Sequence, residues 1–230
     1  MGEPFSTKFP HSMLLNNYLA VAGGIAAFLL IAGLIAGIAA PNDQSAWRIW
    51  PAPPAGSLKS FAFWALFRTL NVVVLILCIE RLLALAAVAP AAMLRLALLL
   101  ISIVAFAAYL YALWVLGRDA TYCRASGLNT EGFYRWTRNP QYATAIVAFG
   151  ALGLAAWSPE ATALAATLVL VYALMAVAEE PWLEARYGRA YAEYRAEVPR
   201  FFNFRHAVVE LAALAARKPQ PLAGQRRNGR

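Results

Sequence analysis

Long apolar runs separated by short polar stretches set the pattern of this chain. Apolar runs of membrane length cover residues 14–40, 61–89 and 92–116, and two more follow at 140–157 and 160–178. An α-helix rises ~1.5 Å per residue, so about 20 apolar residues cross a hydrocarbon core ~30 Å thick. The pattern therefore predicts an all-α polytopic membrane protein with about five transmembrane helices.

The connection between the last two apolar runs is very short. It reads Trp157-Ser158-Pro159, with Ser158 suited to cap a helix and Pro159 suited to the first helical position. So short a turn requires antiparallel neighbours. The polar stretches before and after this hairpin are therefore expected on one membrane face.

The polar stretch before the hairpin, residues 127–142, reads GLNTEGFYRWTRNPQY. Asn139 followed by Pro140 predicts a helix start, which places Arg138 at the mouth of a helix whose free N–H groups attract anions. Glu179 and Glu180 follow the hairpin. We expect them to meet Arg138 on the shared face.

From Glu179 onward the chain is amphipathic until Pro199. One face of this predicted cytoplasmic helix carries residues at 3-and-4 spacing, namely Glu180, Leu183, Tyr187, Tyr191 and Tyr194. The alternative is an interfacial helix with an aromatic anchor and no further role. Another amphipathic stretch is expected at 204–217, ahead of a basic tail.

Composition agrees with a membrane protein, since 61% of the residues are hydrophobic and 14% are charged, against about 25% charged residues in soluble domains. The net charge is +8, but the positive residues are dispersed and gather at membrane edges. Nucleic acid is therefore not expected as a partner. The cysteines and histidines lie far apart in the sequence, which predicts no metal site.

The arginines predict the orientation. Residues 117–138 and the segment after 179 are rich in arginine, whereas the connections at 90–92 and 157–159 carry no basic residue. By the positive-inside rule the polar stretches face the cytoplasm and the N-terminus lies outside.

The second apolar run contains polar residues that a membrane span rarely holds. Arg68 and Asn71 are three residues apart, so they are candidates to line a substrate site together. Alternatively, Arg68 extends to one interface while Glu80 and Arg81 lie near the other.

Three motifs in order carry a family resemblance: G-L-x-T-x-G-x-Y-x-x-x-R-[HN]-P-x-Y, then E-E-x-x-L, then Y-G-x-x-Y-x-x-Y. The matching residues are Gly127, Thr130, Gly132, Tyr134, Arg138, Asn139, Pro140, Tyr142, Glu179, Glu180, Leu183, Tyr187, Gly188, Tyr191 and Tyr194. Residues 117–201 thus resemble the isoprenylcysteine carboxyl methyltransferase and phospholipid methyltransferase superfamily. The chain departs from the family pattern at Asn139, often histidine, and at Thr144, often glycine.

The resemblance implies S-adenosylmethionine-dependent methyl transfer at the membrane surface. A glutamate, Glu179 or Glu180, suits the cofactor's ammonium, Arg138 suits its carboxylate, and Tyr142 suits its sulfonium by cation–π attraction. Arg138 and Tyr142 are the candidate catalytic residues. The candidate cofactor-binding residues are Gly132, Tyr134, Arg138, Asn139, Pro140, Tyr142, Glu179, Glu180 and Leu183, and Arg68 and Asn71 are candidates for the substrate.

The expected domain organisation follows the same division. Residues 1–203 form a single integral membrane domain, with N-terminal spans within 14–116 and a catalytic half at 117–203, and residues 204–230 form an amphipathic helix and basic tail. The expected location is a bacterial inner membrane with the catalytic side cytoplasmic. Membrane lipids and a lipophilic or small-molecule methyl acceptor are the expected partners.

The sequence leaves the identity of the methyl acceptor open. No histidine lies in the motifs, so a carboxylate or thiol acceptor, lipid-like or of the prenylcysteine type, is favoured over an amine, which needs a base. Two other classes compete with a methyltransferase. One is a sterol-type membrane reductase using NADPH, and the other is a non-catalytic transporter or scaffold built around Arg68 and Glu80.

Overall fold

The computed structural model describes residues 9–40, 56–84, 92–121 and 127–202. The tryptophan-containing loop at 41–55, Cys123 and the predicted amphipathic stretch 204–217 lie outside these ranges. The elements are α1 (Phe9–Ala39), α2 (Leu58–Ala84), α3 (Ala92–Thr121), the short 3₁₀ helix η1 (Gly132–Arg135), α4 (Pro140–Ala155) and α5 (Pro159–Glu197).

The prediction of an all-α polytopic membrane protein is confirmed. Helices α1, α2, α3 and α5 are each long and apolar enough to cross a membrane, and the described part of the chain contains no strand. Helix α4, which corresponds to the fourth predicted span, is apolar but has only 16 residues. At ~1.5 Å per residue it is somewhat shorter than a hydrocarbon core.

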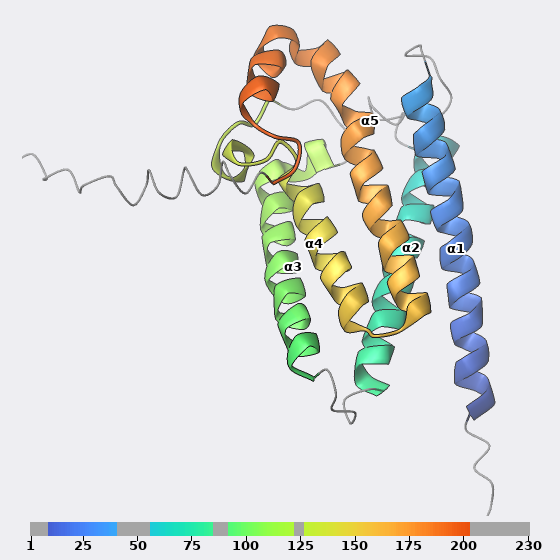
Figure 1. Ribbon diagram of the computed structural model, residues 1–230. Coiled ribbons are helices and arrows are strands. Elements are labelled where there is room, and N and C mark those ends of the chain that lie inside the picture. Colours follow the sequence, from blue (N-terminus) through green and yellow to red (C-terminus); the bar gives the residue numbers. More distant parts are fainter. Residues whose placement is uncertain (1–8, 41–55, 85–91, 122–126, 203–230) are drawn as a thin grey trace, which may run out of the picture.

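The fifth span and the amphipathic helix that follows it are one element. Helix α5 runs for 39 residues through Pro181, and its backbone departs from helical geometry only at Gly188 (φ 52°, ψ −124°). A positive φ of this kind is readily adopted by glycine. The end of α5 thereby turns back over the upper ends of α3 and α4 (Figure 1).

The hairpin of α4 and α5 is closely packed. A Cβ atom on Gly153 would lie 2.4 Å from the Cβ of Ala165, so only glycine allows this approach of the two helices. The hydroxyl of Thr162 donates a hydrogen bond to the Gly153 carbonyl at 2.8 Å. The predicted antiparallel hairpin is therefore present, and it brings both polar stretches to one end of the bundle (Figure 1).

Aromatic side chains fill the core between α5 and its neighbours. The ring of Tyr172 is buried, stacks on Phe149 with 5.8 Å between centroids, and meets Phe67 edge-on at 5.4 Å. Its hydroxyl donates to Asn71 Oδ1 at 2.9 Å. Because the Tyr172 hydroxyl has this hydrogen-bond partner, the bundle accommodates the tyrosine at membrane depth.

A group of charged residues, Glu80, Arg81, Arg95 and Glu160, lies at the opposite end of the bundle from the polar stretches. Glu80 accepts a hydrogen bond from Asn16 of α1 at 2.9 Å, and Arg81 approaches Glu160 at 3.9 Å. Arg95 donates to the carbonyl of Ala155, where α4 ends. These positions agree with the reading in which Glu80 and Arg81 lie near a helix end.

Both predicted helix starts are present, but the predicted caps are not. Asn139 and Ser158 precede α4 and α5, with proline at the start of each helix, yet neither side chain makes a capping hydrogen bond. The Asn139 amide donates to the Arg200 carbonyl instead, and Ser158 donates to Glu160. The buried hydroxyl of Thr144 donates to the Pro140 carbonyl within the first turn of α4.

Candidate functional site

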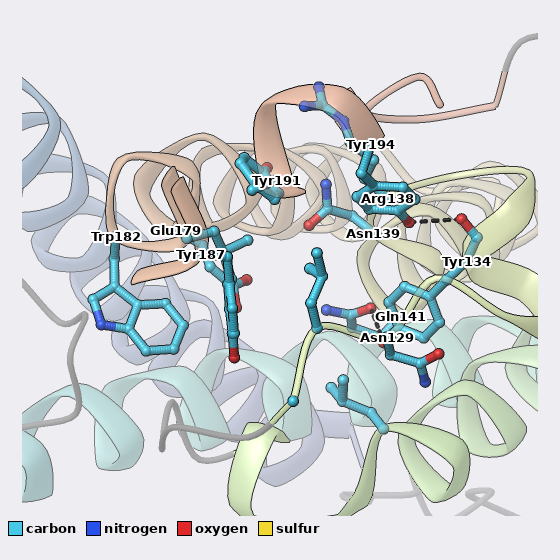
Figure 2. Close-up of a pocket in the computed structure, with 14 residues that line it drawn as sticks. Asn129, Tyr134, Arg138, Asn139, Gln141, Glu179, Trp182, Tyr187, Tyr191 and Tyr194 are labelled. Atoms are coloured by element: carbon cyan, nitrogen blue, oxygen red, sulfur yellow. Dashed lines mark hydrogen bonds between the residues drawn. The ribbon is translucent and has the colours of Figure 1, made fainter. Parts of the chain in front are cut away.

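A cleft opens between the polar stretch before α4 and the second half of α5 (Figure 2). Its empty volume, open mouth included, is about 530 Å³. The residues that line it are Leu116, Gly127, Leu128, Asn129, Tyr134, Arg138, Asn139, Gln141, Glu179, Trp182, Leu183, Tyr187, Tyr191 and Tyr194.

The segment after α5 holds the loop before α4 in place. The backbone N–H of Arg138 donates to the Pro199 carbonyl at 2.9 Å, and the buried Thr137 hydroxyl donates to the Arg200 carbonyl at 2.9 Å. The Asn139 amide donates to the same carbonyl. These bonds between distant parts of the chain fix Arg138 at the inner end of the cleft.

Glu180 lies behind the cleft and binds two arginines. Its Oε1 is 3.0 Å from Nη2 of Arg138, and both of its carboxylate oxygens accept from Arg200, at 2.8 and 2.6 Å. The side chains of Arg138 and Glu180 are 8% and 10% exposed, so the pair is largely removed from water. The hydrogen bond to Glu180 raises the pKa of Arg200 above its ordinary value, which keeps that guanidinium charged.

Four buried side-chain nitrogen and oxygen atoms among the described residues have no hydrogen-bond partner. They are Nε and Nη1 of Arg138, Oε2 of Glu179 and the hydroxyl of Tyr191. All three residues line the cleft. Because a buried polar atom without a partner costs about 1–3 kcal/mol or more, such a cluster indicates a place where a polar ligand supplies the missing bonds.

Tyrosines build the wall beside Arg138. The hydroxyl of Tyr134 donates to Gln141 at 3.2 Å, and that of Tyr194 donates to the Tyr134 carbonyl at 2.6 Å, as Figure 2 shows. Burial, with a contribution from nearby Glu179, raises the pKa of Tyr134 far above its ordinary value. The Arg138 guanidinium lies 5.9 Å from the centroid of the Tyr191 ring, within cation–π range. This wall is therefore neutral and presents hydrogen-bonding groups.

The predicted cofactor residues fall into two groups. Tyr134, Arg138, Asn139, Glu179 and Leu183 line the cleft.

The others do not line this cleft. Glu180 is engaged by the two arginines, and Pro140 is buried at the start of α4. Gly132 is exposed and begins η1 with φ 59°, a backbone conformation that glycine readily adopts. Tyr142 is buried, and its hydroxyl is hydrogen-bonded to Glu179.

Tyr142 faces a second cavity, of about 380 Å³ including its opening, deeper in the bundle. Leu116 and Gln141 line both spaces, so the two adjoin. The other residues of the second cavity are mainly aromatic and apolar, namely Trp64, Phe67, Tyr109, Leu113, Tyr172 and Met175.

The expectation that Arg68 and Asn71 line the site together is not met by their positions. Asn71 turns inward, where its amide donates to the Phe67 carbonyl and its oxygen accepts from Tyr172. Arg68 is exposed, and neither residue lines the cleft or the second cavity. A separation of three residues still rotates a side chain by about 60° around the helix, enough to part them.

Sequence reasoning missed Arg200, which lies just beyond the end of the predicted amphipathic helix at Pro199. It also missed Gln141 and Trp182, which line the cleft. The signal for Gln141 was available, because a polar residue in the first turn of an apolar helix faces something polar. For Arg200 no spacing rule applies, since the chain leaves the helix at Val198 before reaching it.

Fold and site together define a polytopic membrane protein with a polar ligand cleft at one end of its helix bundle. Residues 87–190, somewhat less than half of the chain, match the model of the phospholipid methyltransferase family, which is part of the isoprenylcysteine carboxyl methyltransferase and phospholipid methyltransferase superfamily. The match spans α3, η1, α4 and most of α5. The proteins of that family transfer methyl groups to lipid-type substrates. No curated protein and no solved structure matches the chain significantly.

Proposed function

We propose that this protein transfers a methyl group from S-adenosylmethionine to a lipid-like acceptor, a carboxylate or thiol in preference to an amine, at the cytoplasmic membrane face. The observation that carries the proposal is the set of unpartnered buried atoms on Arg138 and Glu179 in one cleft. One side chain offers two N–H donors, and the other offers a carboxylate oxygen. This is the complement of the amino-acid end of the cofactor.

The residues fit that group in charge and in donor and acceptor chemistry. Nε and Nη1 of Arg138 are charged N–H donors of one guanidinium, and hydrogen bonds from such donors to a carboxylate are strong. Oε2 of Glu179 suits an ammonium, and the Tyr191 hydroxyl supplies a further polar contact. When bound, the cofactor supplies an activated methyl group on a sulfonium.

Of the two adjacent glutamates, Glu179 is the one available to the cofactor. Both oxygens of Glu180 already accept hydrogen bonds from Arg200, and one also contacts Arg138. Glu180 therefore contributes to the site through its contacts with Arg138 and Arg200 and does not bind the cofactor directly. Tyr142 binds Glu179 through its hydroxyl while its ring lines the second cavity, so it stands between the two spaces.

The second cavity suits the acceptor. Its aromatic and apolar lining favours burial of hydrocarbon, and it adjoins the cleft at Leu116 and Gln141. Methyl transfer requires the two reactants to be aligned within about 3–3.5 Å and shielded from water. A lipid-like acceptor held in the second cavity with its polar end toward Gln141 meets both needs, and it can enter laterally from the membrane.

Ligand-induced stabilisation of the purified protein tests the proposal. S-Adenosylmethionine and S-adenosylhomocysteine are expected to raise the unfolding temperature, because a ligand at 100 times its dissociation constant adds about 2.7 kcal/mol of apparent stability. NADPH is expected to have no effect. Stabilisation by NADPH alone would indicate a reductase instead of a methyltransferase. No response to any of the three compounds would contradict the proposal that the cleft binds S-adenosylmethionine.

Acceptor length tests the second cavity. Across acceptors with one headgroup, a longer alkyl chain is expected to raise kcat/KM, by at most about 0.8 kcal/mol per buried methylene. The measurement is the rate of labelled methyl transfer in mixed micelles at fixed headgroup concentration. A rate that ignores chain length, or that is higher for a short soluble thiol, would favour a water-soluble acceptor instead.

A further inference from the structure

We propose that Arg200 is a positioning residue, which holds Arg138 with its unpartnered N–H groups toward the cleft by occupying the carboxylate of Glu180. The proposal rests on the proposed function, since it concerns the cofactor's carboxylate. It gives the segment after α5 a part in ligand recognition in addition to packing.

The geometry of the carboxylate supports this role. Nε and Nη2 of Arg200 reach the two oxygens of Glu180 at 2.8 and 2.6 Å, which is the paired arrangement of a planar guanidinium on a carboxylate. Arg138 is left with a single contact, from Nη2 to Oε1 at 3.0 Å. Its Nε and Nη1 stay without a partner.

Without Arg200, the pairing is free to change. Both oxygens of Glu180 would then be open to Arg138, and paired hydrogen bonds are stronger than the single contact seen here. Arg138 would gain by rotating two donors onto Glu180 and away from the cleft. Occupation of Glu180 by Arg200 removes that competing arrangement.

The net charge of this cluster also supports a positioning role for Arg200. Two guanidinium groups on one carboxylate leave a net positive charge at the inner end of the cleft, whereas Arg138 and Glu180 alone would be neutral. Because Arg138 and Glu180 are about nine-tenths buried, water screens this charge weakly. Arg200 therefore strengthens the attraction of this end of the cleft for an anionic group.

The side chain of Arg200 can be removed without detaching its segment. The carbonyls of Pro199 and Arg200 accept hydrogen bonds from the Arg138 backbone and from Thr137, and these bonds do not involve the Arg200 side chain. That side chain is 38% exposed, so its loss opens little buried space.

The test compares Arg200→Gln with Arg195→Gln. Arg195 pairs with Glu184 at 2.9 Å and is 44% exposed, so it is an arginine of similar exposure that does not line the cleft. The measurement is the dissociation constant of each purified protein for S-adenosylmethionine and for its decarboxylated analogue. We expect Arg200→Gln to weaken binding of S-adenosylmethionine at least tenfold and binding of the analogue less than twofold, with Arg195→Gln unchanged for both.

A second variant and a double variant complete the test. Arg200→Lys restores charge without paired hydrogen bonds and is expected to recover only part of the discrimination. Combining Arg138→Gln with Arg200→Gln should weaken binding no more than Arg138→Gln alone, because Arg200 acts through Arg138. Equal losses for both ligands, additive losses, or wild-type discrimination in Arg200→Gln would overturn the proposal. Failure of the wild-type protein to bind S-adenosylmethionine would instead overturn the proposed function, and this proposal with it.

Discussion

Replacing Arg138 with glutamine is expected to weaken binding of S-adenosylmethionine about 100-fold or more while the helix bundle stays folded. In the variant, the carboxylate of the bound cofactor has lost the buried cation that pairs with it. The loss of one partner of a buried charge pair costs about 3–5 kcal/mol, and every 1.4 kcal/mol is a factor of ten in affinity. The fold survives because Glu180 keeps its two hydrogen bonds to Arg200 when Arg138 is gone. Titration of the purified variants with ligand, alongside their unfolding temperatures, measures both effects.

Arg135→Gln is the control for this variant. Arg135 ends η1 in the same polar stretch, but it is exposed and does not line the cleft. Its replacement is expected to leave affinity unchanged. Glu179→Gln keeps the shape of the side chain and removes the charge, so it should weaken binding through the ammonium. Wild-type affinity in Arg138→Gln would take this residue out of the cofactor site.

The meeting of Arg138 with the glutamates followed from sequence because it depends on topology alone. A turn as short as Trp157-Ser158-Pro159 forces the two helices to be antiparallel, and any polar residues at their open ends must then approach each other. The structure confirms this with the contact between Arg138 and Glu180.

Which glutamate faces the cleft could not be predicted. Neighbouring residues on a helix point about 100° apart, so Glu179 and Glu180 serve different spaces. The rotation of α5 about its axis decides between them, and the packing of Gly153 against Ala165 contributes to that rotation. No motif in one helix encodes the orientation it acquires from its neighbours.

The course of α5 could also not be predicted fully from the sequence. The sequence suggested a new element at Glu179, because the apolar pattern ends there and an amphipathic pattern begins. The helix instead continues through Pro181, and it turns only at Gly188. Hydropathy marks where the surroundings change from lipid to water, whereas the helix ends where backbone geometry changes. Arg200 reaches Glu180 because of the turn at Gly188 and the exit at Val198, which no periodic pattern describes.

Replacing Glu180 with alanine is expected to have the largest effect on stability, about 3–5 kcal/mol. The sequence alone suggested a residue that binds the cofactor. The structure instead gives Glu180 two arginines, one of them buried with it. Alanine would leave the Arg138 guanidinium buried with none of the charge that offsets its loss of water. A loss of this size is a large part of the 5–15 kcal/mol that stabilises a typical protein.

Thermal and denaturant unfolding in detergent, without ligand, measures this effect. Glu184→Ala is the control, because Glu184 pairs with Arg195 at 2.9 Å but is 46% exposed, and exposed pairs contribute at most about 1 kcal/mol. The variant Glu180→Ala combined with Arg138→Met separates charge from packing. Since it removes the stranded buried cation together with its partner, it should regain much of the lost stability. An unfolding temperature for Glu180→Ala equal to that of Glu184→Ala would mean that Arg138 finds water or another acceptor, and that the buried ion pair does not hold this end of the bundle together.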